Sequence, residues 1–281
     1  MMNPVIQKFS GHKILFLLSV IFLLSCNIKK NAMSDKVNGE RDISVAVKLL
    51  EIDNLGNIYV LDIDNKLTKH NQEGKLLFEH YDKQLGIVDA IDVSNPLQIL
   101  VYYKDYGHVK YLDNTLAPIQ TIDLNSDKYF GMETVCQSND NHIWVVDPTI
   151  QRIIKLDKNL NSIFETNNFG DLGLPDGNFI KMRENGHSLV ALHKTQGFIV
   201  FDNFGQFIKK IPSYGALDFQ FDGKALIYKT MTSYRYQKIK FPDFAFISPP
   251  ISINQSQLKV ARKYKETWIV GYSGGVDILK H

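Results

Sequence analysis

The sequence predicts an all-β fold, a β-propeller of six blades with four antiparallel strands each, on three observations. Apolar runs of strand length recur along the chain with a period near 42 residues. Short polar turns rich in Gly, Asn and Asp separate these runs, as in hairpins. No segment shows a sustained 3.6-residue apolar period of useful length, so helices are not expected.

The repeat is clearest in one apolar strand of each unit. These strands read "NIYVLD", "QILVYY", "HIWVVD", "SLVALH", "ALIYKT" and "TWIVGY". Their first core residues are Ile58, Ile99, Ile143, Leu189, Leu226 and Trp268, at intervals of 41, 44, 46, 37 and 42 residues. A turn and another strand precede each of them, and two strands follow. A unit of about 40–45 residues with four strands is typical of a propeller blade.

Burial gives the physical argument for this arrangement. A four-stranded sheet has two faces to bury, and sheets placed around an axis bury each face against a neighbour. Middle strands such as "IWVV" are apolar on both sides, as this packing requires. The chain ends within or just after the third strand of unit six. Either the N-terminal segment around residues 36–45 supplies the fourth strand, or the last blade is incomplete and its edge is covered otherwise.

A targeting segment comes before the propeller. Lys8 and Lys13 precede the apolar run "ILFLLSVIFLLS", which is too short for a stable membrane-spanning helix. The run ends in "FLLSC", which resembles the lipobox of bacterial lipoproteins at Leu24, Ser25 and Cys26. The resemblance implies cleavage before Cys26 and acylation of this residue, for example with palmitate. A plain signal peptide or an uncleaved anchor is the alternative.

The predicted organisation therefore has three parts. Residues 1–25 are a lipoprotein signal peptide, 26–42 are the lipidated Cys26 and a flexible tether, and 43–281 are the β-propeller domain. A short closing strand within the tether is the alternative for that segment. We expect a location in the cell envelope, anchored to a membrane by lipid. Asn27 follows the cysteine, which in the enterobacterial sorting pattern favours the outer membrane.

Charge and cysteine content narrow the function classes. The chain has 32 Lys and Arg against 30 Asp and Glu, and loss of residues 1–25 removes only Lys8 and Lys13. The remaining chain is formally neutral, which argues against a nucleic-acid partner. Cys136 is then the one cysteine left without a lipid, and we interpret it as a small buried residue, with a reactive thiol as the alternative.

The first unit resembles the NHL repeat in its sequence "DNLGNIYVLD". The positions that match the core of that repeat are Asp53, Gly56, Asn57, Ile58, Tyr59, Val60 and Asp62. The unit at 139–164 keeps part of this pattern but lacks the glycine, and later units keep only the alternation of strands and turns. The resemblance implies a six-bladed propeller, which agrees with the six units in the sequence.

Two carboxylates are weak candidates for a metal site. Counting ten residues back from the first core residue of each unit places Asp89 and Glu133 at equivalent positions on adjacent blades. Together they could offer oxygen ligands to Ca²⁺ at a channel mouth, as in propeller lactonases. The other four equivalent positions hold Lys48, Phe179, Ala216 and Leu258. We therefore expect no metal or other cofactor, and interpret both carboxylates as solvated, with Ca²⁺ as the alternative.

Aromatic residues gather in one region of the fifth unit. The stretch "YRYQKIKFPDFAF" alternates aromatic with polar or basic residues, and Tyr234, Tyr236 and Phe241 are candidates for a partner-binding face. Ordinary packing between blades is the alternative.

Two hypotheses on function follow. The first is a membrane-tethered, extracytoplasmic binding or scaffold propeller that acts without catalysis in an envelope protein complex. The alternative is a metal-dependent propeller hydrolase, lactonase or lyase with a calcium site at the channel mouth. No P-loop, GxGxxG, CxxC or HxH pattern occurs in the sequence. We predict no catalytic residue, although enzymatic activity stays undecided at this point.

Overall fold

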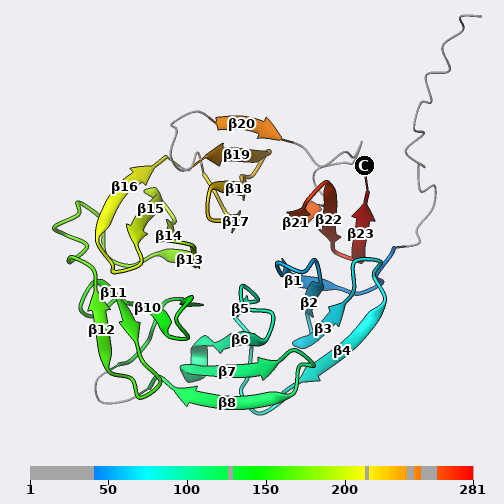
Figure 1. Cartoon of the computed structure of the whole chain (residues 1–281), viewed down its shortest axis with the longest axis horizontal. Coiled ribbons are helices and arrows are strands. Elements are labelled where there is room, and N and C mark those ends of the chain that lie inside the picture. The colour runs from blue at the N-terminus through cyan, green and yellow to red at the C-terminus, as the bar shows by residue number, and fades with distance from the viewer. Residues whose placement is uncertain (1–40, 126–128, 213–214, 239–243, 248–257, 281) are drawn as a thin grey trace, which may run out of the picture. The chain divides into compact units, whose positions relative to one another are not determined.

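Six antiparallel sheets follow one another along the chain in a computed structural model (Figure 1). The structure describes residues 41–125, 129–212, 215–238, 244–247 and 258–280. Five sheets have four strands and the sixth has three, in the orders β1-β2-β3-β4, β5-β6-β7-β8, β12-β11-β10-β9, β13-β14-β15-β16, β17-β18-β19-β20 and β21-β22-β23. The predicted propeller of six blades is confirmed.

The strand bounds match the repeat read from the sequence. Blade 1 is β1 (Val47–Ile52), β2 (Ile58–Asp62), β3 (Lys66–His70) and β4 (Leu76–Tyr81). Blade 2 is β5 (Ala90–Asp92), β6 (Gln98–Tyr103), β7 (His108–Asp113) and β8 (Pro118–Asp123), and blade 3 is β9 (Val135–Gln137), β10 (Ile143–Asp147), β11 (Arg152–Leu156) and β12 (Ser162–Glu165). Blade 4 is β13 (Phe179–Asn185), β14 (Ser188–His193), β15 (Gly197–Asp202) and β16 (Phe207–Ile211). Blade 5 is β17 (Asp218–Phe221), β18 (Ala225–Lys229), β19 (Tyr234–Lys238) and β20 (Phe244–Ile247), and blade 6 is β21 (Leu258–Tyr264), β22 (Thr267–Tyr272) and β23 (Gly275–Leu279).

Helical structure is minor in the described part of the chain. A short 3-10 turn at Lys104–Tyr106 connects β6 to β7. Among the residues that the structure describes, no helix is long and apolar enough to cross a membrane.

The core is divided among the contacts between blades. Each of six clusters of buried apolar side chains draws on two neighbouring blades, and blades 1 and 6 share one of them. Between blades 3 and 4, for example, Trp144 and Ile153 pack with Met182 and Leu189. Both faces of the middle strands are therefore buried, as in β10, where all five residues are buried. This is why the middle strands read as nearly continuous apolar runs.

Side-chain capping shapes the hairpins between the third and fourth strands. In four blades an Asx residue ends the third strand or directly follows it, and its Oδ1 accepts backbone N–H groups from two and four residues further on. These residues are Asn71, Asp113, Asp157 and Asp202. Three residues after each of them the chain adopts positive φ, at Gly74, Leu116, Leu160 and Gly205. The same turn thus recurs where the sequence repeats an Asx residue.

The turn before β2 requires its glycine. Gly56 has φ of +86°, and a Cβ there would lie 2.6 Å from Cε1 of Tyr264 on blade 6. Asp53 organises the same turn, because its Oδ1 accepts the N–H groups of Leu55 and Asn57 at 2.9 and 2.8 Å. The corresponding turn of blade 6 lacks a glycine, and there Lys265 takes φ of +51°.

The N-terminal segment closes the ring. Ile43 and Val276 of β23 exchange two backbone hydrogen bonds, of 3.1 and 2.8 Å. Arg41 forms an ion pair with Asp277 at 2.6 Å, and the Asp42 carboxylate accepts the N–H of Ile278 at 2.7 Å. Among the described residues blade 6 has three strands, and residues 41–43 lie along the outer edge of β23, so both predicted alternatives hold in part. Residues 36–40 of the predicted closing segment lie outside the described residues.

Candidate functional site

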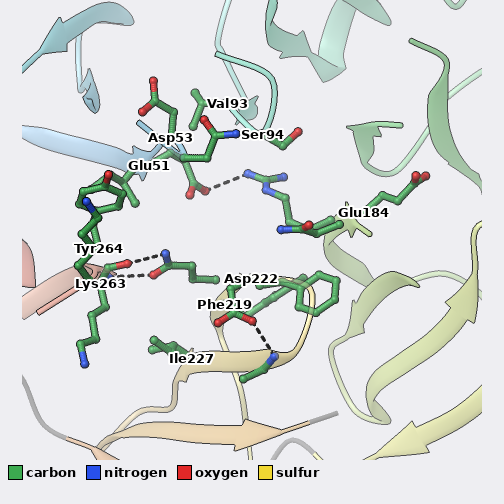
Figure 2. A pocket seen from close by; sticks show the side chains of 18 of the residues that line it. Glu51, Asp53, Val93, Ser94, Glu184, Phe219, Asp222, Ile227, Lys263 and Tyr264 are labelled. Atoms are coloured by element: carbon green, nitrogen blue, oxygen red, sulfur yellow. Dashed lines mark hydrogen bonds and ion pairs between the residues drawn. The ribbon is translucent and has the colours of Figure 1, made fainter. Parts of the chain in front are cut away.

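A cavity opens where the hairpins between first and second strands meet. Its volume is about 810 Å³, and its lining comes from all six blades. The mouth is formed by exposed turn residues, among them Asn54, Ser94, Asn139 and Asn185. Figure 2 shows labelled side chains from blades 1, 2, 4, 5 and 6 around this cavity. Neighbouring hairpins thus bring together residues that are far apart in the sequence.

Glu51 and Arg183 line the cavity and belong to a network of ion pairs between inner strands, which we call the floor. The Glu51 carboxylate on β1 accepts hydrogen bonds from Lys181 and Arg183 on β13, at 2.6 and 3.0 Å. It also accepts two from Arg262 on β21, at 2.9 and 3.1 Å. Asp218 on β17 pairs with Lys181 at 2.8 Å and with Arg262 at 2.6 Å. Four inner strands are therefore joined through two carboxylates.

Blades 2 and 3 join the same network through Asp92. Its carboxylate lies 3.7 Å from the Arg183 guanidinium and accepts the backbone N–H of Gln137 at 2.9 Å. The Gln137 amide in turn donates to the carbonyl of Asp92 at 2.9 Å. Counting Asp92, the network holds three carboxylates, Glu51, Asp92 and Asp218, and three cations, Lys181, Arg183 and Arg262. The floor is thus balanced in formal charge.

The protonation of the floor follows from this pairing. Burial alone would raise the pKa of Glu51, but the fields of Arg262, Lys181 and Arg183 outweigh it and hold that pKa at about 2. Burial likewise opposes ionisation of Asp218, yet Arg262 and Lys181 keep its pKa below the ordinary value. Both carboxylates are ionised at neutral pH, so neither has a proton to give as a general acid.

The walls of the cavity differ from one side to the other. Blades 5 and 6 contribute an apolar and aromatic side with the partly exposed Ile227, Tyr236 and Tyr264, backed by buried Phe219 and Trp268. The ends of their inner strands add the charged Asp222, Lys263 and Lys265 to the lining. The turns of blades 1 to 4 contribute mostly amide and hydroxyl groups. The apolar cluster between blades 5 and 6 is also the smallest of the six among described residues. Trp268 and Ile227 of this cluster line the cavity.

Three further carboxylates belong to the lining. The exposed Asp222 accepts the N–H groups of Lys224 and Ala225 in its own turn, at 2.9 and 2.7 Å. The other two, Asp53 and Glu184, are turned away from the centre of the cavity, as Figure 2 shows. Asp53 is buried and accepts a hydrogen bond from the Tyr59 hydroxyl at 3.1 Å in addition to those of its own turn. Glu184 accepts hydrogen bonds from Ser138 at 2.7 Å and from the indole N–H of Trp144. Neutral donors hold both groups, which serve the turns and the contact between blades 3 and 4.

The structure places Asp89 and Glu133 near the start of their inner strands, which is the opposite end from the cavity mouth. Asp89 accepts the backbone N–H of Lys104 at 2.8 Å. Glu133 accepts the N–H groups of Asn178 and Phe179 at 2.5 and 3.0 Å, and so joins blade 3 to blade 4. Among the described residues, no three His, Cys, Asp or Glu side chains are grouped so as to hold a metal ion.

The aromatic candidates occupy different surroundings. Tyr234 is 5 % exposed and packs edge-to-face on Trp268 at a ring distance of 6.2 Å, between blades 5 and 6. Tyr236 lines the cavity, which fits a role in binding. Phe241 lies outside the described residues, as does Cys26. The role of all four in partner binding or lipidation stays a prediction.

Cys136 is fully buried in the core between blades 3 and 4. Burial raises the pKa of its thiol well above the ordinary value. It packs as the small apolar residue that the sequence indicates. A buried thiol with a raised pKa is a poor nucleophile, which argues against the alternative of a reactive thiol.

Sequence reasoning did not single out Glu51, Arg183 and Arg262. A signal was present, because each is a charged residue within an apolar inner strand, in "VKLLEI", "FIKMRE" and "LKVAR". Inner strands are buried on both faces, so a charge within one is expected to meet an opposite charge across the axis. The partners themselves could not be identified without the fold.

Comparison with known proteins shows the fold and no family. No protein-family model and no curated protein matches the chain. A streptogramin B lyase structure is similar over 85 % of this chain and 84 % of its own, with a TM-score of 0.57 and 12 % identity. An inactive virginiamycin B lyase from Staphylococcus aureus with quinupristin gives 0.55 at 9 % identity, covering 87 % of each chain. A protein of unknown function from Bacteroides caccae gives 0.50 at 11 % identity, covering 73 % of this chain and 78 % of its own.

Proposed function

We propose that this protein is a non-catalytic binding propeller, tethered to a membrane of the cell envelope by lipid on Cys26, which recognises its partner through the central cavity. Its blades are of the NHL-like kind, as the turn built on Asp53 and Gly56 in blade 1 supports. The partner is expected to belong to an envelope protein complex.

The observation that carries this proposal is that the charged side chains of the inner strands pair with one another. Glu51 accepts hydrogen bonds from three cationic side chains, and Asp218 pairs with two of the same cations. Groups that hold each other in this way stabilise the junction of the blades rather than take part in proton transfer. The remaining lining is mostly aromatic, aliphatic and amide, with a few charged residues such as Asp222, Lys263 and Lys265, and such a lining suits a site that binds and orients.

Site-specific photo-crosslinking in membranes tests the binding role. A photoreactive residue in place of Asn185, at the cavity mouth, should capture a protein partner in intact envelopes. The same residue in place of Glu79, on the outer strand β4, is the matched control and should capture none of that partner. Capture of a partner from position 79 alone would place the interface on the outer strands of the propeller and contradict the proposal.

The tether has a separate test. Cys26→Ser should prevent acylation and release the protein from membranes, while the propeller keeps its melting temperature. If the variant stays in the membrane fraction with unchanged mass, the lipid anchor is wrong and the binding role can still be judged by the crosslinking result.

A further inference from the structure

We infer that the ligand group entering the central cavity is the end of an uncharged saccharide. This inference rests on the proposed binding role of the cavity and adds the chemical class of what it binds. The volume of about 810 Å³ lies within the range of roughly 300–1,000 Å³ typical of small-molecule sites. Size admits many ligands, so charge and the chemistry of the walls decide the class.

Charge balance favours an uncharged ligand. The floor holds three cations and three carboxylates that pair with one another, so no buried charge there is left to match a charged ligand. Asp53 and Glu184 are satisfied by neutral donors and are turned away from the centre (Figure 2). The other charged groups of the lining are already engaged: Asp222 accepts two N–H groups of its own turn, Lys263 lies 3.6 Å from Glu266, and the Lys265 ammonium lies over the Tyr264 ring at 5.1 Å. An ion entering this cavity would therefore lose its hydration without meeting an unpaired buried counter-ion, which is costly.

The two-sided lining favours a saccharide among uncharged ligands. A sugar ring has an apolar face of C–H groups and a rim of hydroxyl groups. Tyr264, Tyr236 and Ile227 offer apolar surface on which such a face can pack. On the other side Asn54 and Asn185 lie at the mouth, and an amide both donates to and accepts from hydroxyl groups. A purely apolar ligand would leave those amides without partners.

The closed floor decides how the ligand enters. Ion pairs join the inner strands β1, β13, β17 and β21 to one another, and Glu51 and Arg183 of this network line the cavity. A polymer therefore cannot thread through the channel, and only its terminus, or a free oligosaccharide, can enter from the side of the turns.

Tryptophan fluorescence provides a direct binding assay. The chain has two tryptophans. Trp268 lines the cavity, and the indole of Trp144 donates to Glu184 of the lining. The full chain in detergent is titrated with four trisaccharides: triacetylchitotriose, maltotriose, the cationic glucosamine trimer and the anionic galacturonic acid trimer. We expect saturable binding of at least one uncharged trisaccharide, about tenfold or more tighter than either charged one.

Two variants and one control locate the site. Tyr264→Leu and Asn185→Ala should each weaken binding of the preferred trisaccharide about threefold to tenfold. Tyr81→Leu, the same change as at position 264 but on the half-exposed Tyr81 of β4, should leave binding unchanged. Circular dichroism melts show whether each variant is folded, and the exposed Asn185 keeps the test valid if Tyr264→Leu unfolds.

Three results would overturn the inference. These are tighter binding of a charged trisaccharide, no fluorescence response to either uncharged trisaccharide at millimolar concentration, and equal loss of binding in Tyr81→Leu. None of them depends on the membrane crosslinking, so a protein captured at position 185 would then preserve the binding role while the ligand class fails.

Discussion

Replacing Glu51 by Gln tests the ion network most directly. The substitution keeps the shape of the side chain but removes the charge that meets Lys181, Arg183 and Arg262. Asp92 and Asp218 remain, so the network changes from balanced to one excess buried cation.

The expected loss of stability is large for a substitution that replaces one carboxylate oxygen by an NH2 group. Breaking a buried ion pair by removing one partner costs about 3–5 kcal/mol. The depressed pKa of Glu51 gives an independent figure, because a shift from 4.5 to about 2 corresponds to about 3 kcal/mol at about 1.4 kcal/mol per pH unit. For a domain of this size we expect the melting temperature to fall by roughly 6–20 °C.

The assay is urea and thermal unfolding followed by circular dichroism at neutral pH. Glu79→Gln is the matched control, because Glu79 pairs with Lys66 at 2.6 Å on the surface, where its side chain is 54 % exposed. Such a pair contributes at most about 1 kcal/mol. The double variant Glu51→Gln, Lys181→Met removes one charge of each sign. Its loss of stability should therefore be smaller than the sum of the losses in the two single variants.

The effect must also depend on pH with a definite sign. The pKa of Glu51 is lower in the folded state, so its carboxylate stabilises the fold above about pH 4.5 and loses this effect as pH falls toward 2. The difference between wild type and Glu51→Gln should therefore be full at pH 7 and shrink below pH 4.5. A Glu51→Gln protein as stable as the Glu79→Gln control at pH 7 would refute the reasoning.

Three other predictions use the same unfolding assay. Gly56→Val should destabilise the propeller by about 1–3 kcal/mol, because valine is strained at φ of +86°; an unchanged midpoint would mean that the turn adapts. Arg41→Ala removes the ion pair with Asp277 and should lower the melting temperature more than Lys66→Ala does, which a thermal scan of the two variants decides. Millimolar Ca²⁺ should not move the wild-type midpoint; a rise of several degrees that vanishes in the double variant Asp89→Asn, Glu133→Gln would instead favour the metal-dependent hydrolase, lactonase or lyase.

The blades could be predicted from the sequence because their signals are local. Alternating apolar runs, Asx residues such as Asp113 and Asp157, and glycines such as Gly56 act within one hairpin, so each appears as a short motif. Closure was predictable only as a pair of alternatives, because the contact rests on two or three residues around Ile43.

The cavity floor could not be predicted in the same way. Glu51 meets Lys181 and Arg262 across 130 and 211 positions of sequence, and no periodicity links them. Counting a fixed number of residues back from each second strand also fails. The hairpins differ in length, since Ile52 pairs with Ile58 in blade 1 but Tyr264 pairs with Thr267 in blade 6. Bulges within β1, β13 and β21 shift the inner strands further. The same count therefore reached different heights along the axis.

The seam between residues 41–43 and β23 also determines where mechanical load would act. Tension passed along the chain from residues before Arg41 reaches this seam before it reaches any complete blade. There it is opposed by the ion pair of Arg41 with Asp277, the stacking of Arg41 over Tyr272 at 4.0 Å, and the two hydrogen bonds between Ile43 and Val276. Under a pull from the N-terminal side, the ring would thus open at blade 6 first, while the other five blades keep all four of their strands.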